Sequence, residues 1–341
     1  MTSIELHNVN LISKSCFTNC RSLKNVYCSD LIMYIGEWAF AYCSSMERLS
    51  ISKDAIIDNN ALSNCPAIIE KRNKWDNYLI ESDNLFTLKS MQKNYNSKID
   101  LIIIDPPYNS AVNYIGYMDS SFENGYKCFM KKRIDLSLKI LSKKGFMVIF
   151  IDESEVEELT ELCKECFFKG SVLVRKWKKK HPFFDANRVV LNPNKKQTDF
   201  EYIIFCSKET NTTYRKLMQP YIENNVLCEK ESMIPDTFDC FGTTSSAKDE
   251  IKEIFGDRDF FSTPKPVKIV EEIIMATTDC DSLVLDYFAG SGTTGEAVQI
   301  LNEEDKGSRN FILITNSEND ICKRITKKRL EHAGDDFVYL K

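Results

Sequence analysis

The sequence predicts an α/β protein that combines a doubly wound, mostly parallel sheet with a short N-terminal segment of repeats. Two apolar runs, 99–104 and 146–151, contain almost no polar residues, which is typical of strands buried on both faces of a parallel sheet. Segments with helical periodicity separate such runs. In the first 70 residues a different pattern recurs every 23 positions, so we expect two domains, 1–70 and 71–341.

The composition is that of a folded, weakly acidic chain. Its 341 residues are 43% hydrophobic and carry 45 Lys and Arg against 50 Asp and Glu, a net charge of −5. An acidic total argues against unspecific coating of nucleic acid, although it is compatible with a local basic face. Because the sequence lacks both a long apolar run and a signal-peptide pattern, we expect an intracellular protein, cytoplasmic or nuclear, with no membrane partner.

The cysteines and histidines do not form a recognisable framework. The 13 cysteines are scattered, with one C-x-x-C pair at Cys163 and Cys166, and the three histidines lie far apart. This spacing favours neither a disulfide scaffold nor a zinc site, so we expect no metal.

The N-terminal repeats have fixed apolar positions. With a shift of 23 residues, Phe17 lies on Phe40, Cys20 on Cys43 and Val26 on Leu49; a third partial copy contains Ala61, Leu62, Cys65 and Ile68. The pattern resembles leucine-rich repeats of the BspA-like type, in which small buried cysteines serve packing. Two and a half repeats are too few for an independent solenoid, so we expect them to lean on the next domain, pair with another chain or stay partly mobile.

The elements of the second domain follow from periodicity and from helix-end signals. Gly145 ends one helix, and Ser154 with Glu157 predicts a capping box at the start of the next. The polar stretch 208–259 gives no clear pattern. The expected strands are 78–80, 99–104, 146–151, 172–177, 201–206, 283–286 and 310–315; the expected helices are 85–91, 125–141, 154–168, 267–276, 292–301 and 321–332.

A glycine-rich turn follows the apolar run 283–286. Gly290 and Gly292 allow a sharp bend and a close approach of a ligand to the backbone. No lysine follows them, as a P-loop would require, but Gly295 completes a formal G-x-G-x-x-G. The turn is therefore either a ligand site or an ordinary strand-to-helix connection.

The segment Asp105-Pro106-Pro107-Tyr108 follows the buried strand 99–104. Proline has no backbone donor, so the segment presents carbonyl groups and a carboxylate beside an aromatic ring. Such an acceptor-rich corner suits the exocyclic amino group of a planar base. The alternative is an ordinary prolyl turn, and the strand before it together with Tyr108 favours a functional corner.

The two motifs together resemble the amino-methyltransferases that alkylate adenine N6 in DNA. D-P-P-Y upstream and F-A-G-S-G-T-T downstream is the order of the beta class, and the similarity is greatest to the Mod subunits of type III restriction-modification systems. It covers most of 74–330, including 79–84, 114–122, 129–145 and 261–266. The resemblance implies a Rossmann-like fold in which strands 99–104 and 283–286 are neighbours, so that both motifs line one crevice.

The resemblance also implies S-adenosylmethionine as the cofactor. Lys265 would lie near its carboxylate, Asp83 would contact it from a neighbouring loop, and Glu318 would hold the ribose hydroxyls. The complete set of implied cofactor residues is Asp83, Lys265, Asp286, Phe288, Ala289, Gly290, Gly292 and Glu318.

The implied catalytic residues are Asp105, Pro106, Pro107 and Tyr108. Asp105 and the carbonyl of Pro106 would accept hydrogen bonds from the two amino hydrogens of adenine, which aims the nitrogen lone pair at the methyl group. Tyr108 would stack on the target base after that base has left the duplex.

A basic segment is the candidate contact to nucleic acid. Cations alternate with the aromatic residues Trp177, Phe183 and Phe184, which is a nucleic-acid-binding composition, although a solvated charged loop is the alternative. The cations are Arg175, Lys176, Lys178, Lys179, Lys180, Arg188, Lys195 and Lys196. This segment lies in the short region 171–260, where the family inserts target recognition, so specificity is expected to be short, weak or supplied by a partner. The cluster Lys323–Arg329 is expected to be a solvated helix face.

The leading hypothesis is therefore an adenine-N6 DNA methyltransferase, with DNA as partner and a homodimer or heteromeric partner as the default assembly. Close alternatives are N4 of cytosine in DNA and N6 of adenine in RNA; family members acting on cytosine more often carry serine in place of Asp105. A third alternative is a leucine-rich-repeat binding protein with an inactive methyltransferase domain. A dinucleotide-dependent oxidoreductase leaves Asp105 to Tyr108 unexplained.

Overall fold

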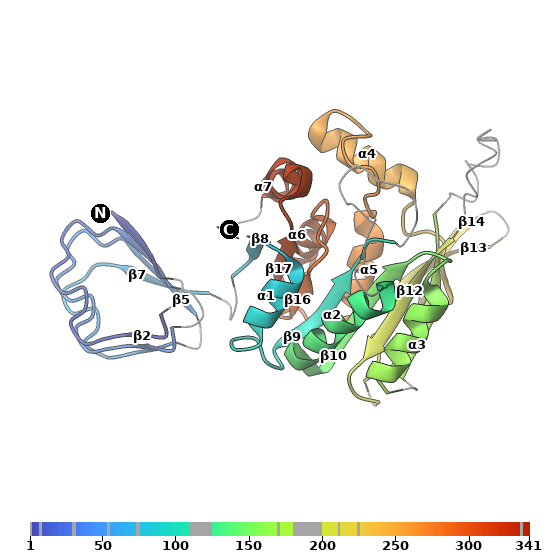
Figure 1. Ribbon diagram of the computed structural model, residues 1–341. Helices are drawn as coiled ribbons and strands as arrows, with labels where there is room; N and C mark the ends of the chain where they lie inside the picture. Colours follow the sequence, from blue (N-terminus) through green and yellow to red (C-terminus); the bar gives the residue numbers. More distant parts are fainter. Residues whose placement is uncertain are drawn as a thin grey trace. The chain divides into compact units, whose positions relative to one another are not determined.

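The computed structural model divides into two compact units, Met1–Asn77 and Tyr78–Lys341, each of which is described by itself (Figure 1). The expected boundary after residue 70 falls inside strand β7 (Ile68–Arg72) of the first unit. Among the described residues no helix is long and apolar enough to cross a membrane. The described residues are 2–6, 9–28, 32–52, 55–72, 76–108, 125–168, 171–179, 200–210, 212–223, 226–334 and 337–341.

The first unit is a parallel solenoid. Its described strands form one sheet in the order β1-β3-β5-β7 and a second in the order β2-β4-β6. Val26 pairs with Leu49 across β3 and β5, which confirms the repeat of 23 residues. The rings of Phe17 and Phe40 stack at 5.2 Å. The bounds are β1 Ser3–Leu6, β2 Leu11–Ile12, β3 Asn25–Cys28, β4 Tyr34–Ile35, β5 Arg48–Ser52 and β6 Ile56–Ile57.

One expectation about the repeats was wrong. The four strands of the larger sheet exceed two and a half repeats, because β1 and β7 extend the stack without the A-F-x-x-C signature. Ile68 of the third partial copy is 69% exposed, and Ile69, which pairs with Leu49, is 42% exposed. Of the recurring cysteines, Cys43 is buried in the core, and Cys20 and Cys65 are half-buried against it.

The second unit is built on one sheet. Its nine described strands follow the order β15-β11-β12-β10-β9-β16-β17-β8-β18. Neighbours are parallel except at β12, which runs antiparallel to both β10 and β11. The strands are β8 Tyr78–Glu81, β9 Ile99–Ile104, β10 Leu141–Ile151, β11 Val172–Lys178, β12 Phe200–Ser207, β15 Thr237–Phe238, β16 Leu283–Asp286, β17 Asn310–Thr315 and β18 Val338–Leu340.

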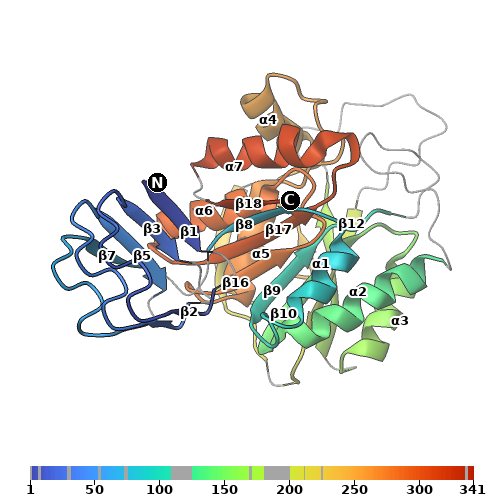
Figure 2. The ribbon, with the colours of Figure 1, turned by 60° about the vertical axis from the view of Figure 1, so that its left-hand side comes forward.

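Helices cover both faces of this sheet. α1 (Asn84–Met91), α2 (Tyr126–Ile140) and α3 (Val156–Cys166) pack side by side on one face, and α5 (Val267–Thr277), α6 (Thr293–Asp305) and α7 (Lys327–Ala333) on the other (Figures 1 and 2). Apolar residues from the central strands and from α5 and α6 form the core. The doubly wound, mostly parallel sheet predicted from the sequence is confirmed.

The strand order reverses between β9 and β16. From β9 the chain crosses through α2 to β10 on one side, and from β16 it crosses through α6 to β17 on the other. The two strands are parallel neighbours (Figure 2), and Leu285 pairs with Ile102. Their carboxyl ends, which lead into the D-P-P-Y segment and the glycine turn, therefore meet at the topological switch point, where ligands bind in folds of this kind.

Several elements differ from the expectation. The polar stretch after residue 208 contains the antiparallel pair β13 (Leu217–Glu223) and β14 (Val226–Ser232), then β15 and helix α4 (Thr244–Phe255). The last helix begins with a π-helical turn, Cys322–Thr326. The capping box at Ser154 was wrong: its hydroxyl donates to Asp152 (2.7 Å), and α3 starts after Glu155 without a side-chain cap.

Candidate active site

The D-P-P-Y corner is a dense polar cluster at the end of β9. Asp105 accepts a hydrogen bond from the Tyr108 hydroxyl on Oδ1 (2.8 Å) and one from the Lys265 ammonium on Oδ2 (2.5 Å). Lys265 Nζ also donates to the Tyr108 hydroxyl (3.1 Å). Pro106 is buried, while Asp105, Pro107 and Tyr108 stay partly exposed. The carboxylate is therefore held in place and keeps access to a ligand.

Glu201 is a member of this cluster that no sequence motif indicated. It lies in β12, and its Oε2 is 3.2 Å from the Tyr108 hydroxyl and 3.3 Å from Lys265 Nζ. Its other oxygen pairs with Lys179 at 3.1 Å. Two carboxylates and two ammonium groups therefore balance in charge around one phenol. The one local signal in the sequence is a carboxylate inside an otherwise apolar strand, which requires a partner when buried.

Burial and pairing set the proton affinities of the cluster. Burial raises the pKa of Asp105, with Lys265 opposing the rise and Glu201 adding to it. Burial also acts to raise the pKa of Glu201, but Lys265 and Lys179 outweigh it and the pKa is lowered. For Lys265, burial acts downward and the two carboxylates reverse it, so its pKa is raised. Burial and the same carboxylates raise the pKa of Tyr108 well above its usual value. At neutral pH the lysine is charged and the phenol keeps its proton.

The glycine turn is organised by Asp286. Its Oδ1 accepts from the amide of Phe288 (2.9 Å) and its Oδ2 from the Thr294 hydroxyl (2.6 Å), so this buried carboxylate shapes the turn from inside. Gly290 and Gly292 have positive φ, +48° and +87°, where side chains are disfavoured. Ala289, from the same implied cofactor set, donates its amide to the carbonyl of Ile314 (3.2 Å).

Gly295, the third glycine of the formal G-x-G-x-x-G, serves helix packing. A Cβ at this position would collide with the side chain of Leu330 and crowd Leu313. The glycine therefore brings α6 close to α7, and no phosphate role is needed to explain it.

The pKa of Asp286 gives a testable pH dependence. Burial raises it from 3.8 to about 7, with Thr294 and the amide of Phe288 opposing. The folded state thus binds the proton more tightly than the unfolded state, and stability falls as pH rises from about 4 to 7, by roughly 1.4 kcal/mol per unit. Asp286→Asn removes this term. In urea unfolding between pH 4.5 and 8, the free energy of unfolding of Asp286→Asn should increase relative to that of wild type as pH rises to about 7. Parallel profiles of the two proteins would contradict the raised pKa of Asp286.

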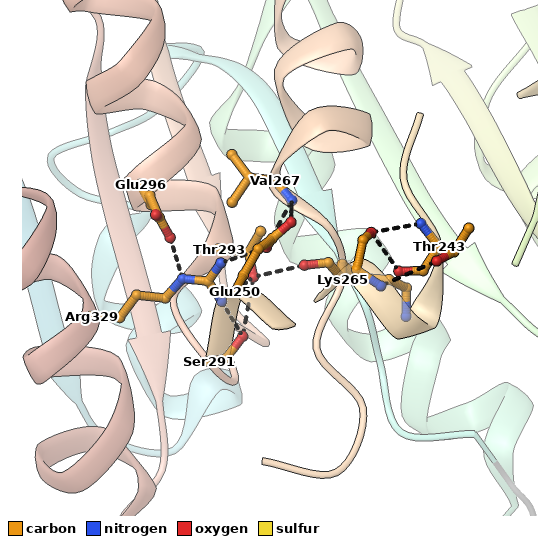
Figure 3. Close-up of polar contacts among 9 residues, drawn as sticks. Thr243, Glu250, Lys265, Val267, Ser291, Thr293, Glu296 and Arg329 are labelled. Carbon is orange, nitrogen blue, oxygen red and sulfur yellow. Dashed lines mark hydrogen bonds and ion pairs between the residues drawn. The ribbon is translucent and has the colours of Figure 1, made fainter. Parts of the chain in front are cut away.

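Lys265 connects the two motifs. Its backbone carbonyl accepts from the hydroxyl of Thr293 at the start of α6 (3.3 Å; Figure 3). Its ammonium reaches Asp105. The side chain is 9% exposed. Together with the pairing of β9 and β16, this confirms that the D-P-P-Y corner and the glycine turn lie together. Contact between Lys265 and a cofactor carboxylate stays a prediction.

The other implied cofactor residues surround the same sheet edge. Asp83 is exposed at the start of α1, where its Oδ1 accepts from the amide of Phe86 (2.8 Å). Glu318 is exposed after β17, which pairs with β8. Phe288 packs its ring 6.1 Å from Phe129 of α2.

Two residues of the matching segments 79–84 and 129–145, to which the sequence analysis gave no role, fix this region. Asn84 donates to the carbonyl of Tyr287 (2.9 Å) and accepts from Nε of Arg133 (2.9 Å). The guanidinium of Arg133 lies 3.5 Å from the centroid of the Phe129 ring. These contacts tie the ends of β8 and β16 to α2.

The basic segment only partly matches its prediction. The prediction that Trp177 stacks on bases was wrong. Strand alternation directs its side chain into the core, where it is 1% exposed and its Nε1 donates to the carbonyl of Gly242 (3.0 Å). Arg175 pairs with Asp236 (3.3 Å) and Lys179 with Glu201. Lys176 and Lys178 lie in β11 on either side of Trp177. Lys180, Phe183, Phe184, Arg188, Lys195 and Lys196 lie outside the described residues.

The helix face around Lys323–Arg329 was also mispredicted in one position. Lys323, Arg324 and Lys328 are exposed, as expected. Arg329 is fully buried and forms ion pairs with Glu250 of α4 and Glu296 of α6 (Figure 3).

Comparison with known proteins identifies two regions. Residues 99–328, more than half of the chain, match the DNA methylase family of the N6 and N4 type. Residues 1–93 match the BspA type leucine rich repeat region, in six copies.

Two Mod subunits and one solved structure are similar to parts of this chain. The chain is 26% identical over 374 residues to the type III restriction-modification enzyme StyLTI Mod subunit of Salmonella typhimurium, covering 77% of this chain and 56% of that protein. It is 24% identical to the EcoPI Mod subunit of Escherichia phage P1, covering 73% and 59%. It thus spans a little more than half of these relatives. A solved M1.HpyAVI–SAM complex matches with a TM-score of 0.49 and 21% identity, covering 74% of this chain and 98% of that one.

Proposed function

Since this chain belongs to the DNA methylase family of the N6 and N4 type, we propose that it transfers a methyl group from S-adenosylmethionine to the N6 amino group of adenine in DNA. One observation carries the proposal: the Asp105 carboxylate and the glycine turn lie at the ends of adjacent parallel strands and are linked through Lys265. A carboxylate that can accept a hydrogen bond from an amino group and a turn that can bind a cofactor lie at one switch point. This arrangement supports methyl transfer from the cofactor to the amino group.

The side chains at this sheet edge fit the cofactor. Exposed carboxylates of Asp83 and Glu318 stand at the ends of the adjacent strands β8 and β17, where they would accept from amino and hydroxyl groups. Phe288 offers a ring, and Gly290 and Gly292 allow close approach to the backbone. S-adenosylmethionine, when bound, supplies an electrophilic sulfonium methyl group.

Asp105 would orient the target amino group. Each carboxylate oxygen has two lone pairs, and the structure occupies one on each, with Tyr108 and Lys265. The remaining lone pairs can accept from an amino hydrogen. The carbonyl of Pro106 would accept the second hydrogen, so the nitrogen lone pair points at the methyl group. The raised pKa of Asp105 suits it to hold the proton that the nitrogen loses after transfer.

Tyr108 would cover one face of the target base. Its hydroxyl is anchored by Asp105, Lys265 and Glu201, so the ring is fixed before any base arrives. A pre-positioned ring lowers the ordering cost of stacking an unpaired base. Lys176 and Lys178 of β11 are the described cations that we propose for phosphate contacts.

Adenine is preferred over cytosine because the corner carries aspartate at position 105, where family members acting on cytosine more often carry serine. We further propose that the chain serves as the modification component of a restriction-modification system, the role after which its relatives, the Mod subunits, are named.

Nucleoside analysis tests the acceptor. The purified chain is incubated with methyl-labelled S-adenosylmethionine and, separately, with double-stranded DNA, single-stranded DNA and RNA, and the digested nucleosides are separated by mass spectrometry. We expect labelled N6-methyladenine from DNA and none in reactions containing excess S-adenosylhomocysteine. Labelled N4-methylcytosine, or label in RNA alone, would overturn the adenine-DNA assignment. Absence of any transfer would favour a binding protein with an inactive domain.

A further inference from the structure

The glycine turn is held from outside by the last helix. We propose that Arg329 is a positioning residue for this turn, and that Glu250 of α4 fixes Arg329 in place. The inference rests on the proposed function, because it assigns these two residues to the geometry of the cofactor site. Neither residue belongs to the motifs that carry the resemblance to DNA methylases.

All three nitrogens of the Arg329 guanidinium donate hydrogen bonds in this region (Figure 3). Nη1 donates to the hydroxyls of Ser291 (3.1 Å) and Thr293 (3.0 Å), which flank Gly292. Nε donates to Glu296 of α6, and Nη2 to Oε2 of Glu250 (3.1 Å). A fully buried guanidinium with all three nitrogens bonded is held in one orientation, and so are the two hydroxyls that it contacts.

A second contact from the same helix reaches the backbone of the turn. The Thr326 hydroxyl, at the end of the π-helical turn, donates to the carbonyl of Gly290 (2.7 Å). Arg329 follows three residues later and therefore lies on the same helix face. The closest neighbours of a Cβ placed on Gly292 are atoms of Thr326, at 3.1 Å and beyond. The helix thus contacts the turn at its backbone and at its side chains, which restrains two glycines of high intrinsic freedom.

Glu250 extends this restraint to α4. Its carboxylate accepts from Nη2 of Arg329 and from the amide of Val267, at 3.3 Å from each oxygen. Val267 begins α5, two residues after Lys265, whose carbonyl bonds Thr293 and whose ammonium bonds Asp105. One carboxylate therefore links α4, in the region expected to contact DNA, to both motifs of the site.

The local charge favours a carboxylate that titrates near neutrality. Arg329 of α7 faces Glu250 of α4 and Glu296 of α6, so one buried cation meets two anions. Burial raises the pKa of Glu250 to about 7, with Arg329 and the amide of Val267 opposing and Glu296 adding to the rise. Below this pH Glu250 loses its charge, and its bond to Arg329 weakens.

A buried ion pair that serves stability alone is the competing explanation. It predicts lower melting temperatures with unchanged cofactor affinity in the molecules that remain folded. A positioning role predicts a change in cofactor affinity itself. If the turn samples more conformations, a smaller fraction of the molecules has the conformation that binds the cofactor, and the apparent affinity falls.

Calorimetric titration with S-adenosylmethionine separates the two explanations. Arg329→Met keeps the bulk of the side chain and removes its donors; Arg324→Met, an exposed position on the same helical segment, is the matched control. At a temperature where circular dichroism shows every variant folded, Arg329→Met should raise the cofactor Kd about ten- to a hundredfold and leave the KM for DNA near wild type. Arg329→Lys should recover part of the loss, and the control should match wild type.

The pH profile tests Glu250 separately. The wild-type cofactor Kd should rise as pH falls below about 7, and Glu250→Gln should hold the weaker, low-pH affinity throughout. Asp286 titrates in both proteins, so the difference between the two profiles is the quantity measured. Coincident profiles would overturn the role of Glu250.

The outcomes distinguish the inference from its premise. A wild-type chain that binds no cofactor overturns the proposed function and the inference with it. A wild-type chain that binds, beside an Arg329→Met variant of equal affinity, overturns the inference alone. If Arg329→Met does not fold, the double variant Ser291→Ala and Thr293→Val replaces it. This variant removes the two hydroxyl acceptors in the turn and leaves the ion pairs of Arg329. An unchanged cofactor Kd in the double variant overturns the inference, and a raised Kd supports it.

Discussion

Asp105→Ala is expected to abolish methyl transfer and to leave cofactor binding close to wild type. In the proposed mechanism the aspartate at the end of β9 accepts hydrogen bonds from the target amino group, while the glycine turn that we propose for the cofactor follows β16 and is shaped by Asp286. Loss of one well-placed polar group in a buried site costs about 10²–10³ in rate, and the simultaneous loss of one of the three contacts that hold the Tyr108 hydroxyl should bring the total to about 10³ or more.

The measurement combines methyl incorporation into DNA with calorimetric titration of S-adenosylmethionine. Asp135→Asn, which changes an exposed aspartate of α2 paired with Lys131, is the matched control and should retain wild-type turnover. Asp105→Asn keeps the shape and one acceptor, so its residual rate should lie between wild type and Asp105→Ala. Wild-type turnover by either Asp105 variant would refute the catalytic assignment.

Lys265→Met is expected to destabilise the fold more than other single lysine replacements in the second unit. Lys265 is the shared cation of Asp105 and Glu201, and its removal leaves two carboxylates facing each other in a largely buried cluster. Removing one partner of a buried pair costs about 3–5 kcal/mol. Without the cation the pKa of Asp105 rises further, so the variant should lose stability relative to wild type as pH increases and come closer to it near pH 5.

Urea unfolding at pH 5 and pH 8 measures this difference. Lys268→Met is the control, since Lys268 lies three residues away, is mostly exposed and pairs with Glu271 on its own helix. We expect the control to change the free energy of unfolding by less than about 1 kcal/mol. Equal losses for the two lysines, or a loss independent of pH, would show that Lys265 does not balance the two carboxylates.

The strands that lead into the two motifs were predictable because burial imposes a composition on them. A strand covered on both faces by helices is apolar along most of its length, and 99–104 and 283–286 show this, with Asp100 and Asp286 as the exceptions. Asp105 and Gly290 stand out because a carboxylate and a glycine interrupt the pattern where a buried strand ends. Their proximity followed from the resemblance and is confirmed by the pairing of Leu285 with Ile102.

Residues whose roles depend on partners far along the chain were not predictable. Glu201 joins Tyr108 and Lys265 only after β12 has entered the sheet beside β10. Arg329 has the sequence context of a solvated basic helix, and its burial depends on Glu250 and Glu296 from two other helices. Neither partner is within a helical turn, so local charge patterning carries no signal of the ion pairs.

Trp177 was mispredicted for a different physical reason. Composition alone treats an aromatic residue among lysines as a stacking ring, but in a strand successive side chains point to opposite faces. The alternation of β11 directs Trp177 into the core, where its ring lies 6.5 Å from that of Phe150. The strand assignment, which was correct, would have been enough to separate Trp177 from Lys176 and Lys178.

A crystal structure of the chain with a cofactor analogue that carries an amino group in place of the sulfonium methyl tests the central claim most directly. If the D-P-P-Y corner and the glycine turn form one active site, that amino group will lie across the gap from the Asp105 carboxylate, within direct or one-water hydrogen-bond reach, and the analogue will contact Phe288 and Gly290. An analogue bound elsewhere, or bound at the turn with its amino group directed away from Asp105, would contradict the proposed methyl transfer.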